Sequence, residues 1–183
     1  MNNLRVMKFG GTSVGSAERI AATARLIAEN SRLRPTVAVV SAMAGVTDLL
    51  VQAAKAAAAG AAAEMEESLA AIRSRHHEAA AQLLSAEQRE AFEASAVQIF
   101  GDVENTCEGI TRLGHCPPRA MDAVLCGGER LSALLVAAVL NESGTPARAL
   151  DATTLVVTDN NFGEAAPLPE PTARRLKEAM PGL

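Results

Sequence analysis

Three short segments of this chain place charged or hydroxyl side chains beside glycines, a combination suited to binding phosphate. The first runs from Lys8 to Ser13; it contains Gly10 and Gly11, and the Lys8 ammonium adds positive charge. Glycine lets the backbone approach a ligand closely, and its N–H group, with those of a following helix N-terminus, can hold phosphate oxygens. The segment therefore favours phosphoryl transfer, which depends mainly on positioning and charge neutralisation. The plainer alternative is a strand-to-helix turn with a solvated lysine.

The second segment comprises residues 41–48, in which Ser41 and Thr47 carry hydroxyls that could orient a small polar substrate. It follows a predicted strand, so in a parallel sheet it lies at the same edge as the first segment, where open α/β sheets bind ligands. Taken alone, it is explained more simply as a turn in which Thr47 or Asp48 caps the next helix.

The third segment, Gly127-Gly128-Glu129-Arg130, places a charged pair behind two glycines and ahead of an apolar stretch. The glycines predict a turn before a helix over residues 131–140, with Glu129 at the start of that helix. An acid there complements the helix dipole and needs no ligand. As a site residue, Glu129 could instead bind an ammonium group.

Other nucleotide and metal motifs are missing from the sequence. No Walker A pattern occurs, and Thr12 breaks the G-x-G of a dinucleotide fingerprint. His76 and His77 stand among charged residues, which predicts a solvated helix face. His115 and Cys116 have no second pair of ligands at suitable spacing, so we expect no metal held by protein side chains. Three cysteines are too few for a disulfide scaffold and indicate free thiols.

Composition argues against several kinds of partner. The 183 residues carry a formal net charge of −4 and 49% are hydrophobic, which disfavours both a nucleic-acid partner and a disordered chain. Aromatic residues make up only 2%, which argues against sites built on base stacking. The first residues lack the long apolar region of a secretory signal, and no stretch reaches about 20 apolar residues; the nearest is 49–63. We expect a soluble cytoplasmic protein without membrane contact.

The elements that must position these segments begin with a β-α-β unit. Residues 4–9 and 35–41 are apolar runs typical of strands, the second apolar enough to be covered on both faces, and residues 17–28 have helical spacing. A right-handed crossover makes the strands parallel. Alanine-rich helices follow to about residue 100, divided at Gly60 and Ser85. Later predicted elements are a helix over 107–113 after a break near Gly101, one over 131–140, strands over 147–150 and 154–157, and a helix over 172–180.

Together the three segments resemble the signatures of the aspartate kinase family. The stretch from Lys8 to Val14 is similar to the N-terminal signature of that family, residues 39–50 to its second segment, and Gly128 to Ser132 to its third. Residues 151–166 are similar to the stretch before the midpoint of the family's catalytic domain. The long helical region resembles the longer-chain class, which includes lysine-sensitive enzymes and forms fused to homoserine dehydrogenase.

The resemblance implies transfer of the ATP γ-phosphoryl group to the side-chain carboxylate of L-aspartate, the first step of lysine, threonine and methionine biosynthesis. It implies the amino-acid-kinase fold, a carbamate-kinase-like α/β/α sandwich of three layers with a mostly parallel sheet. Residues 1–183 would form the N-terminal portion of this domain, with a helical insertion at about 48–113 and no ACT domain. Mg²⁺ would be held by the ATP phosphates.

The resemblance also implies roles for individual residues. Lys8 would be catalytic and would neutralise the transferring phosphoryl group, while Gly10 and Gly11 would hold phosphate oxygens. Ser41 would line the nucleotide site and could touch either substrate. The aspartate site would consist of Thr47 and Glu129, the latter bound to the α-amino group.

The sequence departs from the family pattern by lacking the later glycine-rich segment with its substrate-binding arginine, the nucleotide-base site and the ACT domains. The sheet therefore looks incomplete at its C-terminal side, and we expect little or no kinase activity from the isolated chain. One alternative is a non-catalytic module that assembles, as a homo-oligomer or with a complementary kinase segment, through an unfinished sheet edge. Another is an amino-acid kinase that acts on glutamate or N-acetylglutamate.

Overall fold

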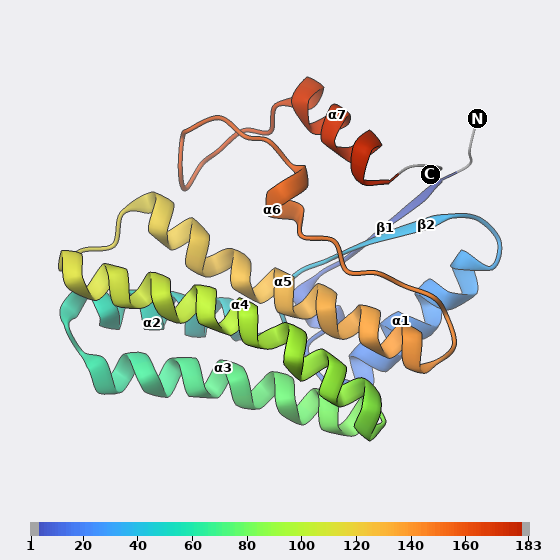
Figure 1. Ribbon diagram of the computed structural model, residues 1–183, viewed down its shortest axis with the longest axis horizontal. Helices are drawn as coiled ribbons and strands as arrows, with labels where there is room; N and C mark the ends of the chain where they lie inside the picture. The colour runs from blue at the N-terminus through green and yellow to red at the C-terminus, as the bar shows by residue number, and fades with distance from the viewer. Residues whose placement is uncertain (1–3, 181–183) are drawn as a thin grey trace.

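The computed structural model describes residues 4–180, in which two parallel strands and a set of long helices succeed one another (Figure 1). The elements in chain order are β1 (Arg5–Phe9), the 3₁₀ turn η1 (Gly11–Ser13), α1 (Ala17–Ser31), β2 (Thr36–Val40), α2 (Val46–Ala59), α3 (Ala62–Leu83), α4 (Ala86–Leu113), α5 (Pro118–Glu142), α6 (Ala152–Leu155) and α7 (Pro169–Ala179).

The predicted β-α-β unit is confirmed. β1 and β2 pair in parallel with Lys8 opposite Val39, and α1 forms the crossover between them. The hydroxyl of Ser16 caps α1 by accepting a hydrogen bond from the Arg19 N–H at 3.3 Å. A short side-chain acceptor in this position satisfies one of the free donors in the first turn of a helix.

The strand pair is covered on one face only, so the expectation that residues 35–41 are buried on both faces is wrong. Phe9 is buried in the core, and α1 and α5 both contact β2. Val6 and Val39, on the other face, are 63% and 48% exposed. A continuous apolar run indicates a strand that can be covered on both faces, but among residues 4–180 helices pack closely on one face only.

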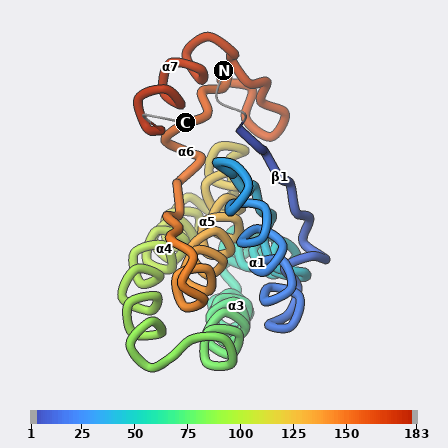
Figure 2. The backbone as a smooth tube through the Cα atoms, turned by 90° about the vertical axis from the view of Figure 1, so that its right-hand side faces the viewer, coloured from blue at the N-terminus to red at the C-terminus, as the bar shows by residue number. Residues whose placement is uncertain are grey.

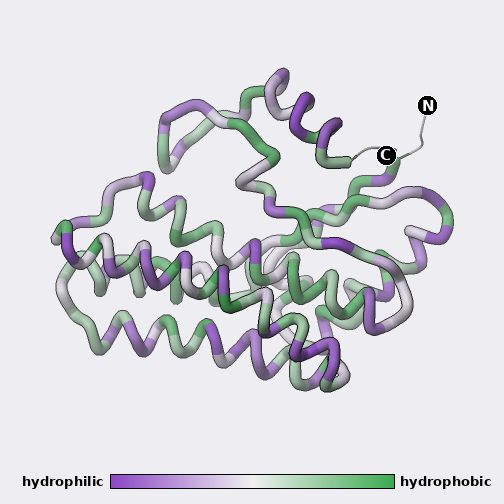
Figure 3. Tube along the Cα trace, viewed as in Figure 1, coloured by the Kyte–Doolittle hydropathy of each residue, from purple (hydrophilic) through white to green (hydrophobic). Residues whose placement is uncertain are grey.

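The alanine-rich region folds into α2, α3 and α4, divided where expected. Gly60 ends α2 in the left-handed conformation, with φ 72°, and the Ser85 hydroxyl caps α4 by accepting from the Gln88 N–H. The predicted break near Gly101 is wrong, since α4 continues through it. Figure 3 shows apolar and polar residues alternating along α3 and α4, as expected for helices with one buried face.

Residues 118–142 form the single helix α5, where the sequence suggested a turn at Gly127 and Gly128. A Cβ on Gly127 would lie 2.5 Å from Val103 Cγ2 of α4, and one on Gly128 would lie 2.8 Å from Ala42 Cβ. Real Cβ atoms essentially never come so close. The two glycines therefore serve close packing of α5 on its neighbours, and they do not interrupt the helix.

The burial of α5 also accounts for its composition. By length and hydropathy it is the one helix among residues 4–180 that could span a membrane, more apolar than the stretch 49–63 noted in the sequence. Its most apolar window is 56% buried inside the protein, and the helix contacts α4, α2 and α1. These contacts are those of a core helix.

After α5 the chain crosses to the other side of the strands, where α6 and α7 stand apart from the helical body (Figures 1 and 2). The strands predicted over 147–150 and 154–157 are not formed: the first range is irregular and the second overlaps α6. An isolated antiparallel bridge joins Thr158 and Pro167. Strand-like sequence is insufficient here because a strand needs a paired neighbour. The final helix is confirmed, although it begins earlier than predicted.

His76 differs from its predicted setting on a solvated face. Its side chain is fully buried between α3 and α4, with Nδ1 2.8 Å from the Ile72 carbonyl oxygen and the ring edge-on to Phe100. Nε2 has no partner, and burial lowers the pKa of His76. His77 is only half-buried, and its Nδ1 lies 3.3 Å from the Glu93 carboxylate.

Candidate active site

Lys8 and the two glycines that follow β1 form one side of the candidate site. Lys8 lies on the exposed face of the strand pair, and its Nζ is 3.8 Å from the place that a Cβ on Gly10 would occupy. The Ser13 N–H donates to the Gly10 carbonyl at 2.9 Å and closes η1. Within residues 4–180, no acceptor is found for the backbone N–H groups of Gly10 and Gly11, which leaves both free to donate to a ligand.

The loop of residues 41–45, which joins β2 to α2, lies against this first segment. The Ser41 N–H donates to the Phe9 carbonyl at 3.1 Å and continues the ladder past the end of β2. A Cβ on Gly11 would lie 2.9 Å from the Ala42 carbonyl oxygen, so a larger residue would push the two segments apart. The 41–45 loop and the glycine turn therefore meet at the carboxyl end of the strands.

The helix after this loop is capped by Gly45, which corrects the expectation of a Thr47 or Asp48 cap. Gly45 has φ 78°, a left-handed conformation that favours glycine, and no side chain caps the helix. The Val46 N–H donates to the Met43 carbonyl at 3.0 Å, so α2 begins before the two expected residues. Thr47 lies exposed in the first turn, where its hydroxyl is available to a ligand.

Glu129 approaches the same loop from the middle of α5, which corrects its expected place at a helix start. Its Oε1 accepts a hydrogen bond from the Ala42 N–H at 3.4 Å. The contact is possible because Gly128 packs directly on Ala42. A helix interior also fixes the direction of the carboxylate more firmly than a loop would.

These contacts form a continuous path from Lys8 to Glu129. The ammonium lies beside Gly10, Gly11 touches Ala42, and Ala42 donates to the Glu129 carboxylate. An ammonium, free backbone donors and a carboxylate are thus gathered at one edge of the strand pair. The first two suit an anion such as phosphate, and the third suits a substrate cation.

Comparison with known proteins gives a match over nearly the whole chain. The sequence profile described as the amino acid kinase family matches residues 3–180. The chain belongs to the amino acid kinase family. Two crystal structures of aspartokinase III from E. coli share the fold of this chain, each with a TM-score of 0.82 over 96% of it. One is described as a complex with lysine and aspartate (27% identity) and the other as a complex with aspartate and ADP (26% identity).

Curated relatives point to the same branch of the family. Aspartokinase 3, chloroplastic, from Arabidopsis thaliana is 32% identical over 163 residues, which are 87% of this chain and 28% of that relative. The aspartokinase of Chlamydia trachomatis is 34% identical over 162 residues, which are 88% of this chain and 33% of that relative. The chain spans a third or less of the length of these relatives, and 37% of the solved aspartokinase III chains.

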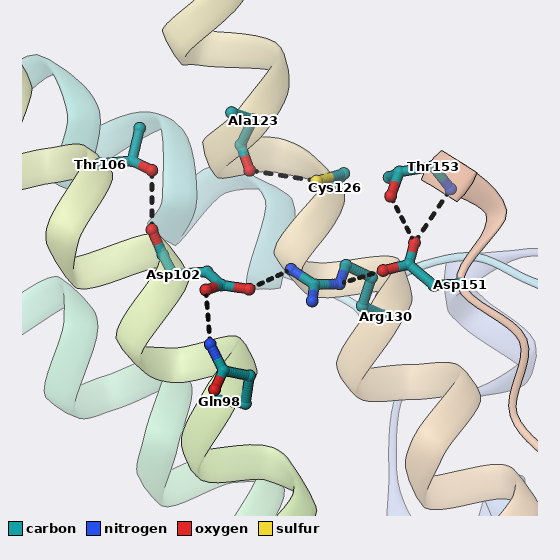
Figure 4. Close-up of polar contacts among 8 residues, drawn as sticks. All are labelled: Gln98, Asp102, Thr106, Ala123, Cys126, Arg130, Asp151 and Thr153. Atoms are coloured by element: carbon teal, nitrogen blue, oxygen red, sulfur yellow. Dashed lines mark hydrogen bonds and ion pairs between the residues drawn. The ribbon is translucent and has the colours of Figure 1, made fainter. Parts of the chain in front are cut away.

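Beside Glu129, Arg130 ties three parts of the chain together (Figure 4). Its Nη1 lies 2.9 Å from an Asp102 oxygen on α4, and its Nε lies 2.9 Å from an Asp151 oxygen just before α6. Hydrogen bonds from Arg130 and Gln98 lower the pKa of Asp102. Asp151 also accepts from the N–H and hydroxyl of Thr153, at 2.9 and 2.7 Å.

Sequence reasoning missed this ion-pair cluster. It noted Arg130 only as a neighbour of Glu129, and nothing in the local spacing singles out Asp102 or Asp151. The two carboxylates come from distant parts of the chain, and only the packing of α4 on α5 reveals the first of them.

No group of three or more His, Cys, Asp or Glu side chains suited to a metal ion is found in residues 4–180. The three cysteines are free thiols, and burial raises the pKa of Cys107 to about 11 and also raises those of Cys116 and Cys126. A raised pKa keeps these thiols protonated and poorly nucleophilic at neutral pH.

Proposed function

We propose that this chain forms the aspartate- and phosphoryl-binding part of an aspartate kinase. The reaction is transfer of the γ-phosphoryl group of ATP to the side-chain carboxylate of L-aspartate, giving 4-phospho-L-aspartate. The proposal places the protein in the cytoplasm, at the first step of lysine, threonine and methionine biosynthesis. The observation that carries it is the continuous path from Lys8 to Glu129, found in a chain whose relatives are aspartokinases.

The residue roles follow from the charges that must be brought together. The acceptor carboxylate has an ordinary pKa near 3.9 and is ionised at neutral pH, so it needs no general base. The obstacle is the repulsion between that carboxylate and the phosphates. Lys8 would offset this repulsion, and the N–H groups of Gly10 and Gly11 would hold phosphate oxygens while the reacting atoms align.

The aspartate would lie between the 41–45 loop and α5. Glu129 would bind its α-amino group, and the exposed hydroxyl of Thr47 would position it from the start of α2. Ser41, at the end of β2, would contact the nucleotide or the amino acid. Mg²⁺, which would enter with ATP on the phosphate oxygens, supplies further neutralisation of charge when bound.

Calorimetric titration of the purified chain with L-aspartate and with L-glutamate tests the assignment. We expect measurable heat with aspartate, a weaker response with glutamate, and loss of aspartate binding in Glu129→Gln. Glu108→Gln is the matched control, since Glu108 pairs with Arg112 on the outer surface of α4. A preference for glutamate would reassign the protein to another amino-acid kinase.

A second function, assembly without catalysis, is favoured by a specific feature of the sheet. A cavity of about 1290 Å³ is lined by β2, α5 and the chain around α6, and its walls include Val37, Val39, Leu140 and Leu150. In the described residues each strand of this two-stranded sheet also has an unpaired outer edge, which invites pairing with another chain. The partner would be a second copy or a complementary kinase segment. Size-exclusion chromatography at several concentrations tests this: a monomer throughout argues against self-association.

Turnover by the 183 residues alone is expected to be low, because the family resemblance assigns the nucleotide-base site to a later segment. Addition of that segment from a relative would then restore turnover, whereas a normal rate without it contradicts this expectation.

A further inference from the structure

The 41–45 loop, which bears Ser41 and leads to Thr47, is held by side chains from two different helices. On one side it receives Glu129 from α5, through the Ala42 N–H. On the other side it receives Arg75 from α3, whose Nη1 donates to the Ala44 carbonyl at 2.8 Å. The second contact comes from the helical region between the second and third segments, which the proposed function leaves without a role.

Gly45 makes room for the Arg75 guanidinium. A Cβ at this position would lie 3.0 Å from Nη1, 3.6 Å from Cζ and 3.7 Å from Nη2 of Arg75. The guanidinium therefore occupies the space beside Gly45 that a side chain would fill, as well as donating to Ala44. Gly45 is needed twice, once for its left-handed conformation and once for this approach.

The same stretch of loop also faces the glycine turn after β1. A Cβ on Gly15 would lie 2.9 Å from Ala44 Cβ, so Ala44, although exposed, contacts both the chain at Gly15 and Arg75. A shift of Ala44 would displace the Ala42 N–H from Glu129 and move the start of α2. The position of the loop thus depends on a guanidinium outside the three segments.

We propose that Arg75 is a positioning residue that holds the 41–45 loop in place for substrate binding. Its effect on substrate rests on the proposed function, whereas its effect on the loop does not. Arg75 acts through the Ala44 carbonyl and touches no reacting atom. The alanine-rich helices are in this way coupled to the site, since movement of α3 along its axis draws the loop with it.

The test compares variants on one helix. Arg75→Met keeps a long unbranched side chain without a donor, and Arg75→Lys keeps a cationic donor. Arg73→Met is the matched control, because Arg73 lies on the same helix but pairs with Glu104 and stacks on Phe100, away from the loop. Exchange of the Ala42 and Val46 amide hydrogens is measured by NMR, together with the urea midpoint of unfolding.

Arg75→Met is expected to speed exchange of these two amides by about three- to tenfold at an unchanged urea midpoint, as for loss of one exposed charge-assisted hydrogen bond. Arg75→Lys should stay within about twofold of the unaltered chain, and Arg73→Met should leave the loop amides unchanged. Equal loop exchange in Arg75→Met and the unaltered chain, or an equal increase in Arg73→Met, overturns the inference.

Aspartate titration separates this inference from the proposed function. If the unaltered chain binds aspartate, Arg75→Met should weaken the affinity by about threefold or more, and an unchanged affinity would contradict the role in substrate positioning. If the unaltered chain binds none, the proposed function fails, while the amide exchange still decides whether Arg75 holds the loop.

Discussion

The two adjacent glycines in α5 allow a sharp test of how the candidate site is assembled. Gly128→Ala adds one methyl group that would lie 2.8 Å from Ala42 Cβ, 3.2 Å from Leu50 Cδ1 and 3.3 Å from Val46 Cγ1. None of these atoms belongs to a long flexible side chain with free space around it, since Ala42, Val46 and Leu50 are all buried. The added methyl group must therefore move α5, the 41–45 loop or α2.

Two opposing free energies set the size of the effect. Alanine in place of glycine inside a helix stabilises it by about 1 kcal/mol. Overpacking of a well-filled core costs about 1–3 kcal/mol. Gly128→Ala is therefore expected to lower the free energy of unfolding by about 1 kcal/mol, and to lengthen the contact between the Ala42 N–H and Glu129.

Gly101→Ala is the matched control. Gly101 lies inside α4, and a Cβ there would meet nothing within 4 Å. The helix propensity gain then stands alone, so this variant should raise the free energy of unfolding by about 0.5–1 kcal/mol. Glycine-to-alanine substitution is thus expected to lower the free energy of unfolding in α5 and to raise it in α4.

Urea denaturation gives the free energies, and amide exchange at Ala42 reports the loop. Removing the obstructing methyl group with Ala42→Gly should recover part of the loss in the Gly128→Ala background, which a double-mutant cycle measures as a favourable coupling. The reasoning fails if Gly128→Ala stabilises the protein as much as Gly101→Ala does, or if the cycle shows no coupling.

Three further outcomes are expected. Lys8→Ala should weaken ATP binding while aspartate affinity stays within about twofold; in an assembly competent for turnover, it should lower kcat far more than it raises KM for aspartate, and the reverse pattern contradicts its role. Burial lowers the pKa of His76, so as the pH falls the unfolded chain binds a proton at this side chain before the folded chain does. The contribution of His76 to the free energy of unfolding is therefore fully present above pH about 6.5 and decreases as the pH falls towards the pKa of the folded state. In His76→Leu the urea midpoint should change less between pH 7.5 and 5.5 than in the unaltered chain. His115→Leu, at an exposed position, should not reduce this change. Arg130→Met should cost about 1 kcal/mol or less and increase protease cleavage near Asp151, which unchanged cleavage would disprove.

The β-α-β unit and the meeting of the first two segments could be predicted from the sequence because topology dictates them. Apolar runs on either side of a short helix force parallel strands, and the loops after parallel strands lie at one edge. Lys8, Gly10, Gly11 and Ser41 therefore fall together on chain order alone. Their chemical roles rest on the resemblance and on the titrations described above.

The geometry around Glu129 could not be predicted in the same way. Two consecutive glycines usually indicate a turn, and this local rule was overridden by the need of α5 to approach Val103 and Ala42 at close range. Gly45 is the converse case, a glycine in a left-handed turn that the nearby hydroxyl side chains obscured. The conformation of these glycines depends on contacts between segments distant in sequence, and hydrophobic periodicity does not predict such contacts.

His76 illustrates the same limit for a polar residue. Its charged neighbours in sequence, Arg75 and Glu78, point to solvent, but an α-helix turns each successive residue by about 100°. One position along, the His76 ring faces α4 and packs on Phe100. A helix face predicted from neighbouring charged residues can therefore include a residue, such as His76, whose side chain in fact points into the core.

Because α5 is uninterrupted, Glu129 belongs to the same rigid helix as residues far from the site. The helix has 25 residues, a length of about 37 Å at 1.5 Å per residue. At the C-terminal end of the helix, Glu142 accepts hydrogen bonds from the N–H and hydroxyl of Ser85, at 2.9 and 2.8 Å. These bonds attach α5 to the connection between α3 and α4. A molecule that separated Glu142 from Ser85 would change the tilt of α5 and so move the Glu129 carboxylate, although it contacted nothing near Lys8.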